Sequence, residues 1–145
     1  MKKALNNYQQ VAVDTNIFIY YFQKHPQFGL VSKELLLILV KNGSQIITSV
    51  ISLIELLSFK TTKQEITTLE HELTHIAKLE MIEVSLEIAK EAASIRREYG
   101  FRLPDSIQLA TAIKAKASIF ITNDQRLKQF KSLKVLLISD IALGE

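Results

Sequence analysis

The stretch VAVDTN, residues 11–16, decides the fold of this chain. Its first three residues are all apolar, which is typical of a short strand buried on both faces of a sheet. Asp14 and the polar residues after it stand where that strand ends. Ligand-binding residues follow the strands of α/β sheets in this way, so the stretch predicts a buried strand with a polar site at its carboxyl end.

Four further apolar runs predict strands like the first one, at residues 45–48, 79–84, 118–122 and 134–138. Helical patterns lie around and between them, at residues 16–24, 28–42, 49–59, 63–78, 86–99, 104–117 and 124–130. Because strands alternate with helices, right-handed crossovers are expected to build a mostly parallel central sheet of about five strands, flanked by helices. The predicted fold class is α/β.

The composition favours a single soluble, intracellular domain. With 145 residues, 48% of them hydrophobic, and no repeats or Pro/Gly-rich linkers, the chain is expected to form one domain over residues 1–145. The absence of cysteine excludes disulfides, zinc–thiolate sites and thiol catalysis, and fits a reducing cytoplasm. The polar N-terminus and the lack of a run of about 18 apolar residues predict neither a signal peptide nor a membrane span.

The net charge and the absence of two phosphate-binding motifs exclude few classes of ligand. The net charge of +3, from 18 Lys+Arg against 15 Asp+Glu, is compatible with a nucleic-acid partner without requiring one. Neither G-x-G-x-x-G nor the Walker-type G-x-x-x-x-G-K-[ST] occurs in the chain. A nucleotide cradle of these two kinds is therefore not expected.

Four acidic residues occupy positions from which a parallel sheet would gather them at one edge. Asp14 ends the first strand, Asp124 follows the fourth, Glu55 lies in the helix after the second, and Asp105 opens a later helix. Each has a structural alternative, because the aspartates suit helix caps or first turns, and Ser52 with Glu55 forms a formal capping box. The neighbours of Glu55 are apolar, so we expect its helix to be largely buried with a positive group facing the carboxylate, or to start late.

Together, the four acids predict a site for a hard metal ion. Clustered carboxylates repel one another unless a cation lies among them. Ligands that are all carboxylates, without cysteine or histidine, suit Mg²⁺ or Mn²⁺ better than zinc. Such an ion retains water and recruits phosphate oxygens, so the expected chemistry is metal-assisted hydrolysis of a phosphodiester.

In order and spacing, the four acidic segments resemble those of the PIN domain, a nuclease family with a parallel sheet between helices. The resemblance rests on VAVDTN around Asp14, a glutamate in an apolar helix at Glu55, DSIQLATA beginning at Asp105, and TND ending at Asp124. It spans about residues 11–138. In size and motif order the chain looks most like the VapC-type toxins of type II toxin–antitoxin pairs, which are Mg²⁺-dependent endoribonucleases.

This resemblance implies a division of roles among the acids. Asp14 and Asp105 would be the main metal ligands. Glu55 and Asp124 would complete the acidic cluster, directly or through water.

Polar neighbours of the acids would support the site. Asn16 and Thr122 match supporting positions of the family, although they suit turns and caps equally well. Many relatives carry asparagine or a shifted acid at the last position of the cluster. Whether Asn123 or Asp124 faces the site therefore stays open.

The resemblance also implies partners. These are an RNA substrate, a second copy of the chain in a homodimer, and a small antitoxin whose helix lies in an apolar groove and whose basic residue reaches the acidic pocket. The alternative from another class is a non-cleaving PIN-like module that binds RNA or protein. Four intact acids argue against that module, because binding alone does not need them.

Basic and aromatic residues near these segments are candidates for contact with RNA. The basic ones, which could bind phosphates, are Arg96, Arg97, Arg102, Lys128 and Lys131. Solvated helix faces explain them equally well, and the first two suit a helix C-terminus before Gly100. Bases could stack on Tyr20, Tyr21 and Phe22, but packing in the core or in a dimer interface is the stronger expectation.

The segment HELTH, residues 71–75, matches H-E-x-x-H, in which two histidines bind zinc and a glutamate is the base of a metallopeptidase. On a helical wheel both histidines lie opposite the apolar stripe, which consists of Ile66, Leu69, Leu73 and Ile76. A catalytic zinc needs a third ligand and a walled cleft, and the other histidine, His25, is far upstream. An exposed helix face is the main expectation, and a peptidase using His71, Glu72 and His75 is the third alternative.

Overall fold

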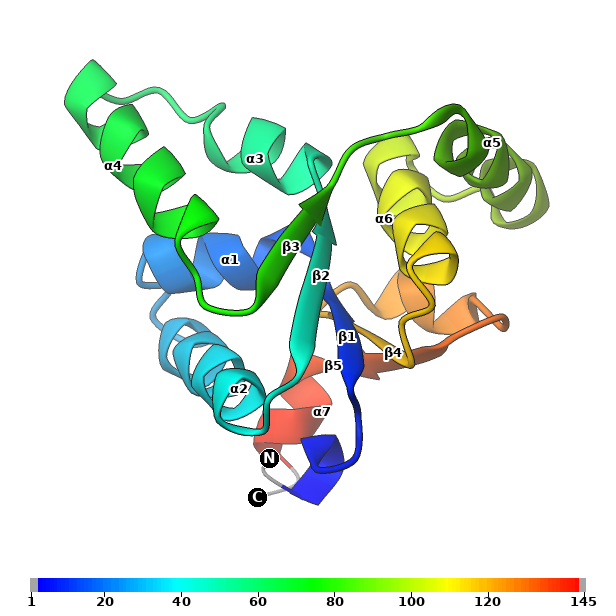
Figure 1. The fold of residues 1–145 in the computed structure, drawn as a ribbon, viewed down its shortest axis with the longest axis horizontal. Helices are drawn as coiled ribbons and strands as arrows, with labels where there is room; N and C mark the ends of the chain where they lie inside the picture. The colour runs from blue at the N-terminus through cyan, green and yellow to red at the C-terminus, as the bar shows by residue number, and fades with distance from the viewer. Residues whose placement is uncertain (1–2, 144–145) are drawn as a thin grey trace.

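The structure is a computed structural model that describes residues 3–143. The described residues form one parallel sheet with the strand order β3-β2-β1-β4-β5 (Figure 1). Its strands are β1 (Gln10–Val13), β2 (Gln45–Ser49), β3 (Leu79–Ile82), β4 (Ile119–Thr122) and β5 (Lys134–Leu137). The predicted α/β class and the predicted parallel sheet are therefore confirmed.

Helices occupy every segment in which the sequence predicts one. They are α1 (Thr15–Phe22), α2 (Gly29–Lys41), α3 (Ile51–Leu56), α4 (Lys63–Thr74), α5 (Leu86–Tyr99), α6 (Leu103–Lys114) and the 3₁₀ helix η2 (Gln125–Gln129). Two short elements of the described residues were not predicted, η1 (Lys3–Leu5) and α7 (Ile138–Leu143). Within residues 3–143, no helix has the length and apolar character needed to cross a membrane.

Several elements end before their predicted boundaries, and the cause is clear for α4 and β3. Helix α4 stops early because His75 caps it and Lys78 adopts a left-handed φ of 65°, which turns the chain into β3. Strand β3 stops early because its neighbour β2 ends at Ser49, the residue with which Ile82 is paired. In both places the boundary is set by a neighbouring backbone, which periodicity along one segment does not reveal.

Alternation of side chains along the strands builds one apolar core on each face of the sheet. Val11 and Val13 belong to the core that includes Phe18 of α1 and side chains of α2 and α7. Ala12 belongs to the opposite core, with Leu109 of α6 and side chains of α5. Figure 1 shows α1 and α2 on one side of the sheet and α5 and α6 on the other. Both faces of β1 are therefore buried, as the sequence predicts.

Strand β1 lies in the middle of the sheet, and the chain changes direction around it. From β1 the chain continues to β2 on one side, whereas from β4 it continues to β5 on the other. The carboxyl ends of β1 and β4 are therefore the usual place for a ligand in a sheet of this kind. The two ends are tied together there, because the backbone N–H of Asp14 donates to the carbonyl of Ile121 at 2.9 Å.

Candidate active site

Asp14 directly follows β1 and is held by two hydrogen bonds. Its Oδ1 accepts from the backbone N–H of Thr15 at 2.8 Å, which makes Asp14 the N-cap of α1. Its Oδ2 accepts from the hydroxyl of Thr122, at the end of β4, at 2.7 Å. The side chain is nearly inaccessible, since the residue is 6% exposed. Asp14 therefore both caps a helix and places a fixed carboxylate at the carboxyl ends of the two central strands.

The environment of Asp14 disfavours its negative charge. Burial, above all, raises the pKa of this carboxyl to about 7, and the nearby charges of Asp105 and Glu55 act in the same direction. The hydrogen bonds from Thr122 and Thr15 lower the pKa, but they do not compensate for the burial. A cation among these acids would favour the ionised form of Asp14.

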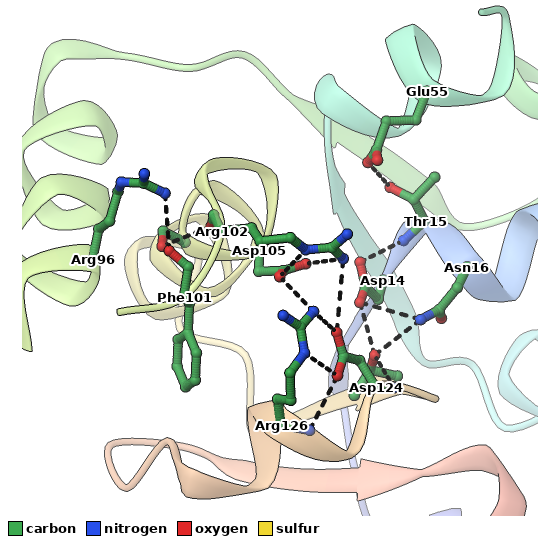
Figure 2. A network of polar contacts seen from close by, with 12 residues as sticks. Asp14, Thr15, Asn16, Glu55, Arg96, Phe101, Arg102, Asp105, Asp124 and Arg126 are labelled. Atoms are coloured by element: carbon green, nitrogen blue, oxygen red, sulfur yellow. Dashed lines mark hydrogen bonds and ion pairs between the residues drawn. The ribbon is translucent and has the colours of Figure 1, made fainter. Parts of the chain in front are cut away.

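Asp105 is a buried acid in the first turn of α6, one residue after Pro104. Two guanidinium groups engage its carboxylate, as Figure 2 shows. Arg102 donates from Nε to Oδ2 at 3.0 Å and from Nη2 to Oδ1 at 3.4 Å, and Arg126 donates from Nη2 to Oδ2 at 3.4 Å. The predicted acid at this position is therefore present in the cluster, and it is paired with two arginines.

Asp124 follows β4 and joins Asp105 through the same two arginines (Figure 2). Its Oδ1 caps η2 by accepting from the backbone N–H of Arg126 at 3.0 Å, and the guanidinium of Arg126 bonds to both carboxylate oxygens. The Arg126 hydrogen bond is the main reason why the pKa of Asp124 is lowered. Arg102 lies 3.7 Å from Oδ2 of the same carboxylate.

Asp124 rather than Asn123 faces the acidic cluster. The side-chain amide of Asn123 donates to the hydroxyl of Tyr20 at 3.2 Å, and its oxygen accepts from the backbone N–H of Ser139 at 3.3 Å. These contacts direct Asn123 toward α1 and α7. Of the two residues between which the sequence could not decide, Asp124 is therefore the one at the acidic cluster in this structure.

Glu55 lies beside the cluster on the short helix α3. Its Oε1 accepts from the hydroxyl of Thr15 at 2.8 Å. The expectation of a largely buried helix is wrong, because α3 has only six residues and Ile54 is 57% exposed. The partner of the carboxylate is a hydroxyl rather than a positive group, and Ser52 lies inside α3 instead of capping it. Glu55 is therefore half-buried and linked to Asp14 through the single residue Thr15.

Asn16 and Thr122 are both in contact with Asp14. The Nδ2 of Asn16 donates to the hydroxyl of Thr122 at 3.2 Å and lies 3.5 Å from Oδ2 of Asp14. Among the described residues, Oδ1 of Asn16 is buried and has no hydrogen-bond partner. A buried oxygen of this kind is an exception that needs an explanation, such as an ion or water.

The donor atoms of the site fit a hard divalent ion. They are carboxylate, hydroxyl and amide oxygens, and they include the buried Oδ1 of Asn16, which has no hydrogen-bond partner among the described residues. A cation would also relieve the repulsion of Asp14 by Asp105 and Glu55. Within residues 3–143, no three acidic or histidine side chains are arranged to hold an ion as they stand. The oxygens of Asp105 and Asp124 are engaged by Arg102 and Arg126, so ion binding requires these two arginines to move.

The other predicted basic residues lie away from the acids. Arg96 donates to the carbonyl of Phe101 at 3.0 Å, on the far side of Arg102 in Figure 2. Arg97 is exposed in the last turn of α5. The side chain of Lys128 forms an ion pair with the exposed Asp140 at 3.2 Å. The backbone N–H of Lys131 donates to the hydroxyl of Tyr99. Of the predicted phosphate-binding residues, Arg102 is thus the one that reaches the acidic cluster.

Sequence reasoning missed several polar residues that build the site. They are Arg126, which holds Asp124, and the buried network of Thr15, Thr48, Ser52 and Gln108 behind Glu55. A signal existed for Gln108, because it is the one carboxamide in the otherwise small or apolar stretch SIQLATAI. For Arg126 the only signal was its position two residues after an acid.

The aromatic cluster of α1 packs against its neighbours, as the sequence analysis favours. Tyr20 contacts the rings of His25 and Phe28, with centroids 4.8 and 5.2 Å away. Tyr21 and Phe22 are half-buried against the core on the same face of the sheet. These three rings therefore serve packing in the described structure.

The HELTH histidines point away from the core. Leu73 is buried while His71 and His75 are exposed, so the helical wheel predicts these faces correctly. The two imidazole rings stack on each other with centroids 3.9 Å apart, and Nδ1 of His75 lies 2.7 Å from the carbonyl oxygen of His71. Rings that stack face to face do not converge on a single ion. The geometry fits a surface helix face.

Replacing both histidines, His71→Ala with His75→Ala, is expected to leave the metal-dependent RNA cleavage that the sequence predicts within about twofold of the wild type, because exposed side chains away from the site contribute little. Initial rates of RNA cleavage, measured side by side, check this. Peptide hydrolysis that is lost in the same variant would instead support the metallopeptidase alternative.

Comparisons with known proteins bear on the fold and on the family. Among solved structures, the chain is similar to one from the VapBC2 complex of Rickettsia felis bound to promoter DNA, with 24% identity, a TM-score of 0.72, and coverage of 88% of this chain and 98% of that chain. It is also similar to a chain of a toxin–antitoxin complex from Klebsiella pneumoniae, with 23% identity, a TM-score of 0.67, and coverage of 88% and 97%. A third similar chain comes from DNA-bound VapBC of Salmonella typhimurium. It has 17% identity and a TM-score of 0.69, and the match covers 89% of this chain and 98% of that chain. These likenesses establish a shared fold.

The search among curated proteins gave no significant match. A family model described as PIN domain matches residues 11–133, which include all four acids of the site. Since this match covers most of the sequence, the chain belongs to the PIN domain family.

Proposed function

We propose that the chain is an Mg²⁺- or Mn²⁺-dependent endoribonuclease and the toxin of a type II toxin–antitoxin pair. The observation that carries the proposal is the convergence of Asp14, Asp105 and Asp124 at the carboxyl ends of β1 and β4. Membership of the PIN domain, a nuclease family, supports it. Three acids whose own ligand atoms are all oxygens suit phosphodiester hydrolysis assisted by a hard ion.

The proposed roles follow from where each acid lies. Asp14 and Asp105 would hold the ion, while Glu55 and Asp124 would complete its surroundings directly or through water. A bound divalent ion supplies polarisation of the phosphate, an activated water and charge for the leaving oxygen. The carboxylate of Asp14 is already fixed by its two hydrogen bonds, so little reorganisation is needed for it to bind the ion.

Arg102 and Arg126 are proposed to bind the phosphate next to the bond that is cut. Their side chains are 64% and 53% exposed, yet their guanidinium groups reach the buried acids. A guanidinium matches two phosphate oxygens with two parallel hydrogen bonds. An ion at Asp105 and Asp124 would release these groups, which could then turn to the RNA. Ion and substrate binding would therefore be linked through the two arginines.

Cleavage assays with single-stranded and structured RNA test the proposal. Purified protein is incubated with each RNA in Mg²⁺, in Mn²⁺ or in EDTA, and the fragments are separated on a gel. Internal cleavage that requires a divalent ion is the expected result. RNA binding without any cleavage would favour the non-cleaving module, and cleavage in EDTA would contradict the role of the ion.

We further propose that an antitoxin binds in the grooves beside α1. One groove of about 420 Å³ is lined by Tyr21, Phe22, Lys24, His25, Gly29, Leu30, Lys33 and Glu72, and a neighbouring groove includes Phe59 and Leu69. Leu30 in the first groove is 85% exposed, which is unusual for a large apolar side chain and suits an amphipathic helix as partner. Both grooves are near the end of α1 distant from Asp14, so a further segment of the partner would reach the acids.

The substitution Leu30→Asp is expected to weaken antitoxin binding by about 30- to 100-fold, because it places a charge in the apolar contact. RNA cleavage by the free variant should not change. The partner to use is the product of a short reading frame directly beside the gene, and calorimetry measures its affinity. Unchanged affinity would place the antitoxin elsewhere on the surface.

A homodimer and a cytoplasmic location complete the proposal. The exposed Leu86 and Leu103, at the starts of α5 and α6, offer apolar surface for a second copy of the chain. Sedimentation equilibrium is expected to give twice the mass of the chain. The cytoplasmic location follows from the proposed RNA substrate and is consistent with the absence of cysteine.

A further inference from the structure

Behind the acidic cluster lies a buried polar network centred on Gln108. The middle of α6, from Asp105 to Ala112, is wholly buried, and Gln108 is 2% exposed. A buried carboxamide is costly unless all its groups are hydrogen-bonded. Gln108 meets this demand, because its oxygen accepts from the backbone N–H of Ser49 at 3.1 Å and its nitrogen donates to Thr15 and Ser52 at 3.0 and 2.9 Å.

The direction of these bonds is fixed by the backbone of β2. The N–H of Ser49 can only donate, so the atom of Gln108 that faces it must be the oxygen Oε1. The amide nitrogen Nε2 then faces Thr15 and Ser52, and both hydroxyl groups must accept from it. One backbone N–H therefore sets the orientation of the whole carboxamide.

The same logic assigns the hydrogens of the hydroxyl groups. The Ser52 hydroxyl lies 2.7 Å from that of Thr48, which donates to the carbonyl of Val13 at 2.9 Å, so the hydrogens of Ser52 and Thr48 have acceptors within the network. The Thr15 hydroxyl accepts from Gln108 and keeps one hydrogen, which has two acceptors within reach, the hydroxyl oxygen of Ser52 at 2.9 Å and Oε1 of Glu55 at 2.8 Å. The carboxylate of Glu55 is the stronger acceptor of the two. Thr15 is therefore free to donate to Glu55.

We propose that Gln108 is a positioning residue, which orients Glu55 by making the Thr15 hydroxyl donate to it. The network connects α6, α1, α3 and β2, so four separate segments are held in the arrangement that aims Glu55 at the site. The role of Glu55 as an acid of the nuclease site rests on the proposed function. The direction of the Gln108 bonds rests on the hydrogen-bond geometry alone.

The substitution Gln108→Glu tests the direction of the network, because it keeps the shape and replaces two donor hydrogens by an acceptor. The hydrogen of Thr15 would then turn to the introduced carboxylate and leave Glu55. Thr15→Val removes the same donor from the other end. Each variant is expected to lower Mn²⁺ affinity, measured by calorimetry, and kcat for RNA cleavage by about tenfold or more, with KM little changed.

Three further variants make the result specific. The double variant with Gln108→Glu and Thr15→Val is expected to lose no more than either single variant, because both remove one hydrogen bond. Thr15→Ser, which restores the hydroxyl, should recover most of the loss seen in Thr15→Val. Thr111→Val is the control, since Thr111 is equally buried on α6 and its hydroxyl bonds to the carbonyl of Ile107 in its own helix.

The proposal is overturned if Gln108→Glu binds Mn²⁺ with the affinity of the wild type. It is also overturned if the losses of activity in Gln108→Glu and Thr15→Val add in the double variant, or if the variants lower Tm but leave Mn²⁺ affinity and kcat unchanged. NMR of the metal-free protein tests it independently of any activity. The side-chain amide protons of Gln108 should exchange slowly with solvent in the wild type. If they exchange as fast as those of exposed glutamines, the proposal is also overturned. A wild type that binds Mn²⁺ but cuts no RNA would count against the nuclease function and leave these network tests intact.

Discussion

Replacing Asp14 with asparagine is expected to abolish metal-dependent RNA cleavage and, at the same time, to stabilise the metal-free protein near pH 8. The rate should fall by about 10³-fold or more, because Asp14 is a proposed ligand of the divalent ion and such an ion contributes several kcal/mol of transition-state stabilisation. The gain in stability has a different cause. The Asp14 carboxylate is buried, and burial raises its pKa from 3.8 to about 7.

The sign of the pH dependence follows from that raised pKa. Between about pH 4 and pH 7 the folded protein holds a proton on Asp14 that the unfolded chain has released, so its stability is greatest at the acidic end of this range. The contribution is lost as the pH rises through 7. At pH 8 the ionised carboxylate costs about 2–4 kcal/mol, which the neutral asparagine avoids.

Urea unfolding of both proteins in EDTA, at several pH values from 4 to 8, measures this effect. The wild type should lose stability across the range, whereas Asp14→Asn should lose much less. Asp140→Asn is the control, because Asp140 is an exposed aspartate outside the acidic cluster. Parallel curves for wild type and Asp14→Asn would show that Asp14 is ionised at no cost, and burial could then no longer account for the pH dependence.

Removing both guanidinium groups, with Arg102→Ala and Arg126→Ala together, is expected to change ion and RNA binding in opposite directions. The oxygens of Asp105 and Asp124 lose their two competing partners, so Mn²⁺ should bind about tenfold more tightly. The phosphate loses two bidentate donors, so kcat/KM for RNA should fall by about 100-fold.

Calorimetry with Mn²⁺ and steady-state cleavage kinetics measure the two effects separately. A variant with Lys41→Ala and Lys90→Ala removes the same charge from exposed positions on α2 and α5 and serves as the control. Its Mn²⁺ affinity should change little, and its rate should fall only as far as general attraction to RNA requires. Weaker Mn²⁺ binding in the arginine variant would mean that the guanidinium groups support the ion site instead of competing for it.

The sequence predicts the sheet and the approach of the acids for clear physical reasons. Apolar runs such as VAV report burial on both faces, and parallel pairing then forces residues after the strands, such as Asp14 and Asp124, to the same edge. The helical period also predicted correctly that the HELTH histidines are exposed. Each of these predictions depends on a local pattern of apolar and polar residues, which helix geometry or parallel strand pairing converts into a position in space.

The remainder of the site depends on contacts between distant segments. The bond from Thr15 to Glu55 joins residues forty positions apart, and the pairing of Asp105 with Arg126 spans twenty-one. No periodicity reports which hydroxyl meets which carboxylate. For Glu55 the sequence predicted either a positive partner or a helix that starts late. The structure shows a hydroxyl partner on a helix that begins at Ile51. Arg126 was overlooked, although it contacts both Asp105 and Asp124.

The pairing of β1 with β4 also determines how early the acidic cluster can form while the chain is being synthesised. Val11 pairs with Ile119, so the central strand β1 waits for a neighbour that is made more than a hundred residues later. Until β4 has emerged and docked, Asp14 lacks the hydroxyl of Thr122 and stands apart from Asp124. The proposed nuclease site is therefore expected to form only late in translation, after β4 has been made.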